Sequence, residues 1–291
     1  SAAANIATAP TGLLIPPSNV MITFSLVSGG TSVAALFMAG YIPGALWALA
    51  CMLVVYIYAK KAGYRSQTKL TGKEKFNAFI QALPCLLLII IVIGGIIAGV
   101  FTATEGSVVA VVYSLLLSIY GYKSMKWKDL PEIFRSSAEM TGIIIFLIGV
   151  SSIMSWVMAF TNIPTMVSNG LLSISSNKYV ILLMINIILL VVGTFMDMTP
   201  ATLIFTPIFL PVCTALGMNT IHFGIMLIFN LCIGTITPPV GTTLFVGVKV
   251  GGVKIETVFK HLLPYFFAII VVLMLVTYIP QLSLWLPGLM G

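Results

Sequence analysis

Long apolar segments alternate with short polar connections along most of this 291-residue sequence. A helix rises 1.5 Å per residue, so about 20 apolar residues cross a hydrocarbon core about 30 Å thick. Residues 31–41 carry no charge and are expected to lie along a membrane surface. The remaining pattern predicts membrane-crossing helices over residues 43–58, 79–100, 107–120, 140–160 and 264–286.

Basic residues gather in two of the polar connections. Residues 62–78 carry several lysines and Arg65, and residues 121–135 carry three lysines and Arg135. Lysine and arginine are concentrated in the cytoplasmic loops of membrane proteins. Both connections are therefore expected in the cytoplasm, whereas the nearly uncharged residues 161–177 are expected to form an external connection.

Two further apolar arms, residues 179–194 and 203–216, are joined by the short turn FMDMTPA. Each arm is at or below the length that crosses the hydrocarbon core. Two ordinary crossings would leave Asp197 and two turn signals at a membrane surface with no basic companion. The pattern therefore predicts a re-entrant hairpin over residues 178–216, with its tip near the middle of the membrane.

A different pattern, an apolar segment interrupted at its middle, occupies NLCIGTITPPVGTTLFVG. Pro238 and Pro239 remove two backbone donors, and Thr237 is pushed out of the helical region. The freed carbonyl groups need polar partners inside a membrane. We expect two half-helices over residues 221–249 that meet at an unwound loop, where the helix ends carry partial charges. A proline kink that a neighbouring helix heals is the alternative.

The same interruption occurs near the start of the sequence. Gly12 aligns with Gly234 at an offset of 222 (234 − 12), and Pro16–Pro17 aligns with Pro238–Pro239 at the same offset. The first copy ends among uncharged residues and the second among lysines, so their ends are expected on opposite sides of the membrane. Paired interrupted helices in an inverted repeat are typical of the binding sites of secondary transporters.

The composition agrees with a membrane protein. Hydrophobic residues make up 59% of the chain and charged residues 7%, and the mean hydropathy is +1.14. The basic loops account for the net charge of +7, so nucleic acid is not an expected partner. The four cysteines stand apart without metal-site spacing and are expected to be buried. Placement at the membrane interface is expected for Trp47, Trp127, Trp156, Trp285, His222 and His261.

Asp197 is the one acid inside an apolar stretch, which makes it a candidate cation ligand together with Thr199, Thr202 and the hairpin backbone. Capping of the second arm is the alternative role for its carboxylate, and the two roles are compatible. Glu105 is a weaker candidate, because a helix-capping carboxylate explains it equally well. The motifs of metalloproteases and serine hydrolases are absent, so an enzyme is not expected.

Four stretches, GLLIPPSNVMITF, FTATEGSVVAVVYSLL, GTFMDMTPATLIFTPIFLP and NLCIGTITPPVGTTLFVG, resemble the large (M, DctM-like) membrane subunit of tripartite ATP-independent periplasmic (TRAP) transporters. The resemblance follows the family's order over essentially the whole chain. It implies an all-α integral membrane protein of the inverted-repeat elevator type, with a re-entrant hairpin and two broken helices. It also implies sodium-driven uptake of a small organic acid such as a sialic acid, a C4-dicarboxylate or a sugar acid.

The resemblance further implies two protein partners in the bacterial inner membrane system: a small membrane subunit and a periplasmic substrate-binding protein. Sodium is the one expected bound ion, and no other cofactor is expected. By the matching motifs, sodium is expected at Asp197, Thr199, Asn230, Gly234, Thr235 and Thr237, and at Thr8, Thr11 and Gly12. Substrate is expected at Ser18, Thr202, Pro239 and Thr242.

The family's first hairpin is expected before Ser1, so the sequence is expected to be an N-terminally incomplete fragment that does not transport alone. Residues 1–61 then form the remainder of the first repeat, and residues 79–291 form the second, with the C-terminus in the periplasm. Two other functions remain open: a stand-alone sodium/dicarboxylate symporter, and a structural membrane subunit without transport. A channel is disfavoured because the sequence has no rings of charge or filter-like repeat.

Overall fold

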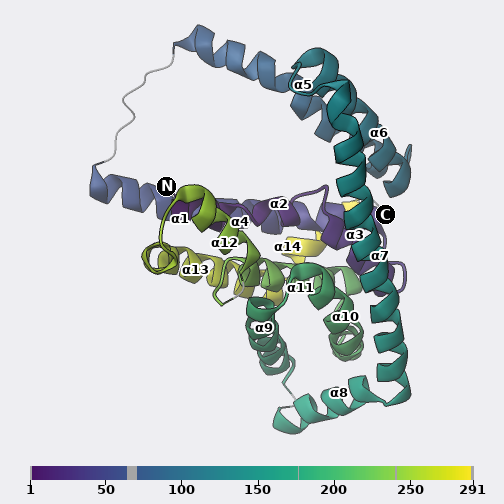
Figure 1. Ribbon diagram of the computed structural model, residues 1–291. Helices are drawn as coiled ribbons and strands as arrows, with labels where there is room; N and C mark the ends of the chain where they lie inside the picture. Colours follow the sequence, from purple (N-terminus) through teal and green to yellow (C-terminus); the bar gives the residue numbers. More distant parts are fainter. Residues whose placement is uncertain (1, 64–70, 176, 240, 290–291) are drawn as a thin grey trace. The chain divides into compact units, whose positions relative to one another are not determined.

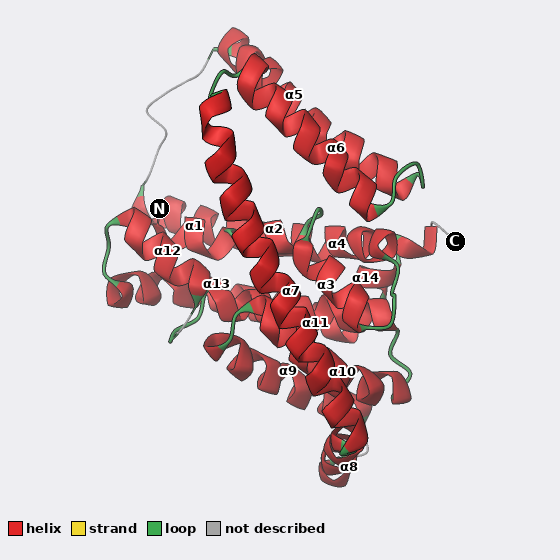
Figure 2. Cartoon of the chain, turned by 45° about the vertical axis from the view of Figure 1, so that its right-hand side comes forward, coloured by secondary structure: helices red, strands yellow, loops and turns green. Residues whose placement is uncertain are grey.

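A computed structural model describes residues 2–63, 71–175, 177–239 and 241–289, and its regular secondary structure in these residues is entirely helical (Figures 1 and 2). Six described helices are long and apolar enough to cross a membrane, and one bent helix pair is a further candidate. The chain divides into two compact units, Ser1–Ala62 with Ile148–Gly291, and Gly63–Leu147. Each unit has its own set of packed helices.

The segment predicted to be the remainder of the first repeat contains four helices: α1 (Ala2–Thr8), α2 (Thr11–Leu14), α3 (Asn19–Val27) and α4 (Val33–Ala62). The chain leaves the helical conformation between α2 and α3, where Pro16 and Pro17 cannot donate backbone hydrogen bonds. The pair α1–α2 and helix α3 are bent by 46° at this break. The first interrupted segment is thus a broken helix.

Helix α4 corrects one prediction. Residues 31–41 and 43–58 were expected to be separate segments, but α4 continues through Pro43. A proline is tolerated inside a membrane helix where neighbouring segments pack around it. Here Gly40 lies against the carbonyl of Leu14, and Gly44 lies against the side chain of Ile15. Helix α4 is therefore closely packed by α2 and by the first break in the region where it contains Pro43.

In the predicted second repeat, the broken helix consists of α11 (Thr220–Thr235) and α12 (Thr242–Gly251). Helix α13 (Ile255–Tyr278), the short helix α14 (Gln281–Leu284) and a 3₁₀ turn, Pro287–Leu289, follow it. Helix α13 begins 222 positions after α4 (255 − 33), so the offset seen in the sequence also relates the helices. The last span was predicted to start at Pro264. That start was wrong, because α13 already begins at Ile255 and includes Pro264.

The two broken helices pack side by side in opposite directions. Ala2 and Ile6 of α1 lie against Gly251 and Gly247 of α12, respectively. Farther along, the thiol of Cys232 lies 3.7 Å from the carbonyl oxygen of Pro10. Next, the ring of Phe24 on α3 meets that of Phe223 on α11, with centroids 6.1 Å apart. Residue numbers rise along one broken helix as they fall along the other, as an inverted repeat requires.

The hairpin lies in the same unit and consists of α9 (Lys178–Phe195) and α10 (Met198–Ala215). Each arm has 18 residues, and Met196 and Asp197 form the break between them. Helix α9 packs on α11, and α10 packs on α3 and α11. Both arms are candidate spans by length and composition, so the depth of the tip in a membrane stays a prediction.

The connection before the hairpin contains a helix that the sequence analysis did not predict. Residues 163–174 form α8 (Ile163–Ile174), which packs on α10. Asn162 precedes α8 in the left-handed conformation, and a proline occupies its first turn. Ile163, Val167, Leu171 and Ile174 recur at helical spacing. The low charge of this segment indicates only a connection, whereas the spacing of its apolar residues indicates a helix.

The second unit contains α5 (Gly72–Ile97), α6 (Ala103–Leu116), a π-helical turn (Leu117–Gly121), a 3₁₀ turn (Trp127–Asp129) and the first part of α7 (Leu130–Phe160). Helices α5 and α6 form a hairpin in which Tyr113 donates to the carbonyl of Pro84 at 2.8 Å. The Glu105 carboxylate accepts from the backbone N–H of Thr102 at 2.8 Å, which is a capping role. Arg65 and Lys69 of the predicted basic loop lie outside the described residues.

Candidate functional site

The second break concentrates carbonyl oxygens in a tight turn. Helix α11 ends at Thr235, and its carbonyl would need an N–H from residue 238 or 239, both of which are proline. The carbonyl oxygens of Thr235 and Thr237 both lie close to the Cα of Gly241, because a Cβ there would stand 2.8 and 2.7 Å from them. The turn therefore requires glycine at position 241 and leaves backbone oxygen atoms available to a cation.

The threonine side chains at both breaks donate back to helix carbonyls. Thr235 donates to the carbonyl of Cys232 at 2.8 Å, and Thr237 donates to that of Ile233 at 2.7 Å. At the first break, Thr8 donates to Ala4 at 2.9 Å and Thr11 to Thr8 at 2.6 Å. These bonds use the hydroxyl protons, so the lone pairs of the hydroxyl oxygens remain free to coordinate a cation.

The hairpin tip lies beside the second break. Gly234, in the last turn of α11, touches the backbone of Gly193, in the last turn of α9. A Cβ on Gly234 would overlap the carbonyl group of Gly193. The absence of a side chain at Gly234 permits this approach, whereas a Cβ on Gly193 would lie 3.4 Å from the Cα of Gly234, an ordinary contact distance. The contact brings the turn at Met196 and Asp197 and the unwound loop to the same end of two packed helices.

Asp197 occupies the N-cap position of α10, but its side chain forms no capping hydrogen bond. The capping role considered for this carboxylate is therefore absent from the structure, and the side chain is exposed. Thr199 follows in the first turn and is half-buried. Thr202 is fully buried one turn later, and its hydroxyl has no hydrogen-bond partner. Thus α10 presents a free carboxylate and a buried polar oxygen along its first turns.

A buried amide chain connects the break to the hairpin. Asn230 of α11 donates to the side-chain oxygen of Asn186 on α9 at 2.6 Å, and Asn186 donates to Thr277 on α13 at 3.1 Å. The amide oxygen of Asn230 has no partner. Asn230 was predicted as a site residue, but Asn186 and Thr277 were not. The isolated polar position in KYVILLMINIILL was the signal for Asn186.

The first break has its own polar contacts. Ser18 is buried at the N-cap of α3, and its hydroxyl has no partner. Trp47 donates its indole N–H to the carbonyl of Ala7 at 2.8 Å. The expectation that Trp47 lies at a membrane interface was wrong, because the ring is fully buried against Phe229. The carbonyl of Ala7 lies in the last turn of α1, where helix carbonyls lack a partner within the helix, so it accepts this hydrogen bond.

His222 was also wrongly placed at an interface. Its ring is 3% exposed, and Nε2 lies 2.8 Å from the carbonyl oxygen of Val276. His261 is exposed, and its placement at a membrane interface stays a prediction. Three of the cysteines are buried, whereas Cys85 is exposed. Among the described residues, no group of three or more histidine, cysteine or acidic side chains is placed to hold a metal ion.

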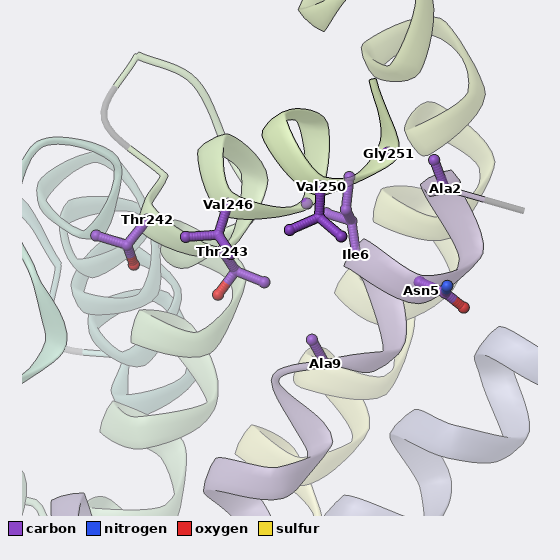
Figure 3. A pocket seen from close by; sticks show the side chains of 10 residues that line it. Ala2, Asn5, Ile6, Ala9, Thr242, Thr243, Val246, Val250 and Gly251 are labelled. Carbon is purple, nitrogen blue, oxygen red and sulfur yellow. The ribbon is translucent and has the colours of Figure 1, made fainter. Parts of the chain in front are cut away.

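A cavity of about 440 Å³ lies between α1 and α12 (Figure 3). Its lining includes Asn5 and Ile6 of α1 and Thr242, Thr243 and Val246 of α12. Of the residues predicted for substrate, only Thr242 lines this cavity, while Ser18 and Thr202 belong to α3 and α10 and Pro239 is exposed in the second loop. The predicted substrate residues are therefore not brought together in this cavity.

Comparisons with known proteins agree with this architecture. The family model described as the DctM component of the tripartite ATP-independent periplasmic transporter matches residues 1–282. The uncharacterized protein YgiK of Salmonella typhimurium is 53% identical over 99% of this chain and 66% of its own length. The sialic acid TRAP transporter large permease protein SiaM of Vibrio cholerae is 37% identical over 96% of this chain and 65% of its own length.

The C4-dicarboxylate TRAP transporter large permease protein DctM of Pseudomonas aeruginosa is likewise 37% identical, over 96% of this chain and 65% of its own length. The chain thus spans about two thirds of the length of these relatives. Six apolar helices of spanning length identify a multi-pass membrane protein. With the family match over nearly all its residues, the chain belongs to the DctM family of TRAP transporter components, which are permeases and not enzymes.

Proposed function

We propose that this chain is the sodium-binding and substrate-binding part of a transporter that takes up a small organic acid across the bacterial inner membrane. Uptake is coupled to a sodium gradient, and a periplasmic binding protein delivers the substrate. A small membrane subunit completes the system. The relatives named for sialic acid and C4-dicarboxylate support an organic acid as the substrate class.

One observation supports the proposal above the others: the contact between Gly193 and Gly234. It holds the hairpin tip next to a loop in which Pro238 and Pro239 have removed the backbone donors that the carbonyl of Thr235 would need. A free carboxylate, carbonyl oxygens and hydroxyl oxygens at helix ends are the groups from which transporters build sodium sites. Asp197, Thr199, Asn230, Gly234, Thr235 and Thr237 are the proposed ligands or ligand-bearing residues at the second break.

The first break is proposed to hold sodium in the same way. Thr8, Thr11 and Gly12 precede the first proline pair, as Asn230, Ile233 and Gly234 precede the second. Because the two broken helices run in opposite directions, a carboxylate substrate placed between them meets the N-terminal ends of α3 and α12. Ser18 and Thr242 lie at those ends and are proposed to orient it, with Thr202 and Pro239.

Coupling follows from the same geometry. A sodium ion held jointly by the hairpin tip and the unwound loop fixes both segments, and the substrate then binds a site that is already ordered. Each ligand thereby strengthens the binding of the other by the same factor.

The test is the sodium dependence of uptake by the assembled three-component transporter in proteoliposomes. Asp197→Ala and Thr237→Ala each remove one proposed oxygen ligand and are expected to raise the half-saturating sodium concentration about tenfold, equivalent to about 1.4 kcal/mol. Thr214→Ala is the matched control, because Thr214 is exposed at the far end of α10 and donates only to helix carbonyls.

Unchanged sodium activation in both variants would refute the ligand assignment. Uptake that persists without the binding protein would instead favour a stand-alone symporter. Normal assembly without any transport, in the unsubstituted system, would favour a structural subunit.

A further inference from the structure

A large apolar groove runs between α4 and α13, which pack against each other in the first unit. Its volume is about 1010 Å³. Leu53 and Ile57 of α4 and Phe267 and Val271 of α13 form its walls, and all four side chains are exposed. None of the residues proposed to bind sodium or substrate lines this groove.

One end of the groove is polar and positively charged. Lys61 lines it there, and the hydroxyl of Tyr58 lies 3.3 Å from Nδ1 of His261 across the two helices. Lys60 and Lys260, which precede Lys61 and His261 in the chain, are exposed. Within the described residues, none of these three lysines forms an ion pair with a carboxylate.

The polarity of the helices adds to this charge. Helix α13 begins at Ile255, six residues before His261, so its unpaired N–H groups lie near the polar end of the groove. The N-terminal end of a helix carries partial positive charge and favours an anion. Glu256 in the first turn of α13 offsets part of this positive charge, but with three lysines against one carboxylate the mouth of the groove stays net positive.

The length of the groove matches one leaflet of a bilayer. Ala50 and Lys61 mark its extent on α4, and the 11 residue steps between them (61 − 50) rise about 17 Å. Half of a hydrocarbon core about 30 Å thick is about 15 Å. An acyl chain whose head group lies at Lys61 therefore extends along the apolar walls as far as the middle of the membrane.

We propose that this groove binds an anionic phospholipid from the leaflet that faces the basic loops. The acyl chains lie along α4 and α13, and the phosphate group is held by Lys61, the hydroxyl of Tyr58 and the neighbouring lysines. The lipid joins the last helix of the first repeat to the corresponding helix of the second.

The experiment compares phosphatidylglycerol with phosphatidylcholine of identical acyl chains on the delipidated chain in a neutral detergent. Bound lipid is counted by native mass spectrometry, and the shift in melting temperature is measured in parallel. Wild-type protein is expected to retain phosphatidylglycerol at least fivefold better, since each lysine near a membrane surface contributes about fivefold. Inorganic phosphate at the same concentration is expected to cause no shift.

Two variants separate charge from shape. The double variant Lys60→Gln, Lys61→Gln is expected to lose the preference for phosphatidylglycerol while still binding both lipids. Ala268→Trp fills the groove and is expected to reduce binding of both lipids severalfold. The matched controls are Lys249→Gln, at the end of α12, and Leu275→Trp, which is exposed on α13 outside the groove.

Equal retention of the two lipids by the wild-type protein would overturn the proposal, and this measurement does not depend on whether a variant folds. A melting-temperature shift with inorganic phosphate as large as that with phosphatidylglycerol would show a simple anion site and would also overturn it. The proposal fails as well if Lys249→Gln abolishes the preference as fully as the double variant.

Discussion

The absence of a side chain at Gly234 sets how closely the hairpin approaches the second broken helix. A Cβ there would overlap the carbonyl group of Gly193, so α9 and α11 would have to move apart. Overpacking of this kind costs about 1–3 kcal/mol. Gly234→Ala is therefore expected to lower the free energy of unfolding by about this amount, measured by denaturant titration in detergent.

Gly12 supplies the matched control, because it occupies the same repeat position but has no atom within 4 Å of a Cβ. Gly12→Ala is expected to leave stability unchanged or raise it by up to about 1 kcal/mol, since alanine restricts the unfolded chain. Equal losses in both variants would mean that the contact with Gly193 does not cause the destabilisation.

Trp47 makes a second testable residue-scale contact. Trp47→Phe keeps an aromatic ring against Phe229 but removes the indole donor to the carbonyl of Ala7, which retains only the weak thiol donor of Cys51 at 3.7 Å. A buried acceptor left without its partner costs about 1–3 kcal/mol. We expect a lower melting temperature in this variant, whereas Trp285→Phe, at a side chain that is 59% exposed, should melt like the wild-type protein. A melting temperature unchanged in Trp47→Phe would show that another donor replaces the indole.

At the scale of elements, local chemistry made the breaks predictable. Proline pairs cannot donate to a helix, so the interruptions at both copies followed from residue type alone. Helix α8 and the continuous α4 were missed because they depend on periodicity and on packing by neighbouring segments. Asn186 was missed for a related reason: its partners lie 44 and 91 positions away in the chain. The isolated asparagine in an apolar helix marks the residue itself, but the local sequence does not identify its distant partners.

The antiparallel packing of the broken helices can be tested by a disulfide. A Cβ built on Gly247 lies 3.6 Å from the Cβ of Ile6, within the range found in disulfides. In a background without native cysteines, Ile6→Cys with Gly247→Cys is expected to cross-link under mild oxidation, as detected by peptide mass spectrometry. Ile6→Cys with Ile228→Cys, the pair that a parallel alignment at the 222-residue offset would join, should remain reduced.

Cross-linking of the second pair without the first would contradict the inverted arrangement.

The two broken helices differ in how well they are covered. Phe24 on α3 is fully buried under α10 and α11, whereas Val246, at the equivalent position of α12, is 63% exposed. Within the described residues no hairpin covers α12 as α10 covers α3, and the cavity of Figure 3 lies along this uncovered face.

At the scale of the whole molecule, composition and hydrophobic pattern were sufficient for the membrane class and the helical fold. The candidate site was less predictable. The sequence pointed to both breaks and to Asp197, but the bonds of the threonine hydroxyls and the free position of the carboxylate depend on three-dimensional packing. The orientation of the chain in the membrane follows from charge and remains a prediction.

Reporter fusions test that orientation. Lys249, Lys254 and Lys260 surround the connection between α12 and α13, so this connection is expected in the cytoplasm and α13 is expected to run outward. Alkaline phosphatase, which is active only in the periplasm, should therefore be active when fused after Leu289 and inactive when fused after Ser124. A green fluorescent protein that folds only in the cytoplasm should give the opposite pattern. Active phosphatase at both positions, or at neither, would contradict the inverted topology, because the charge argument places these two positions on opposite sides.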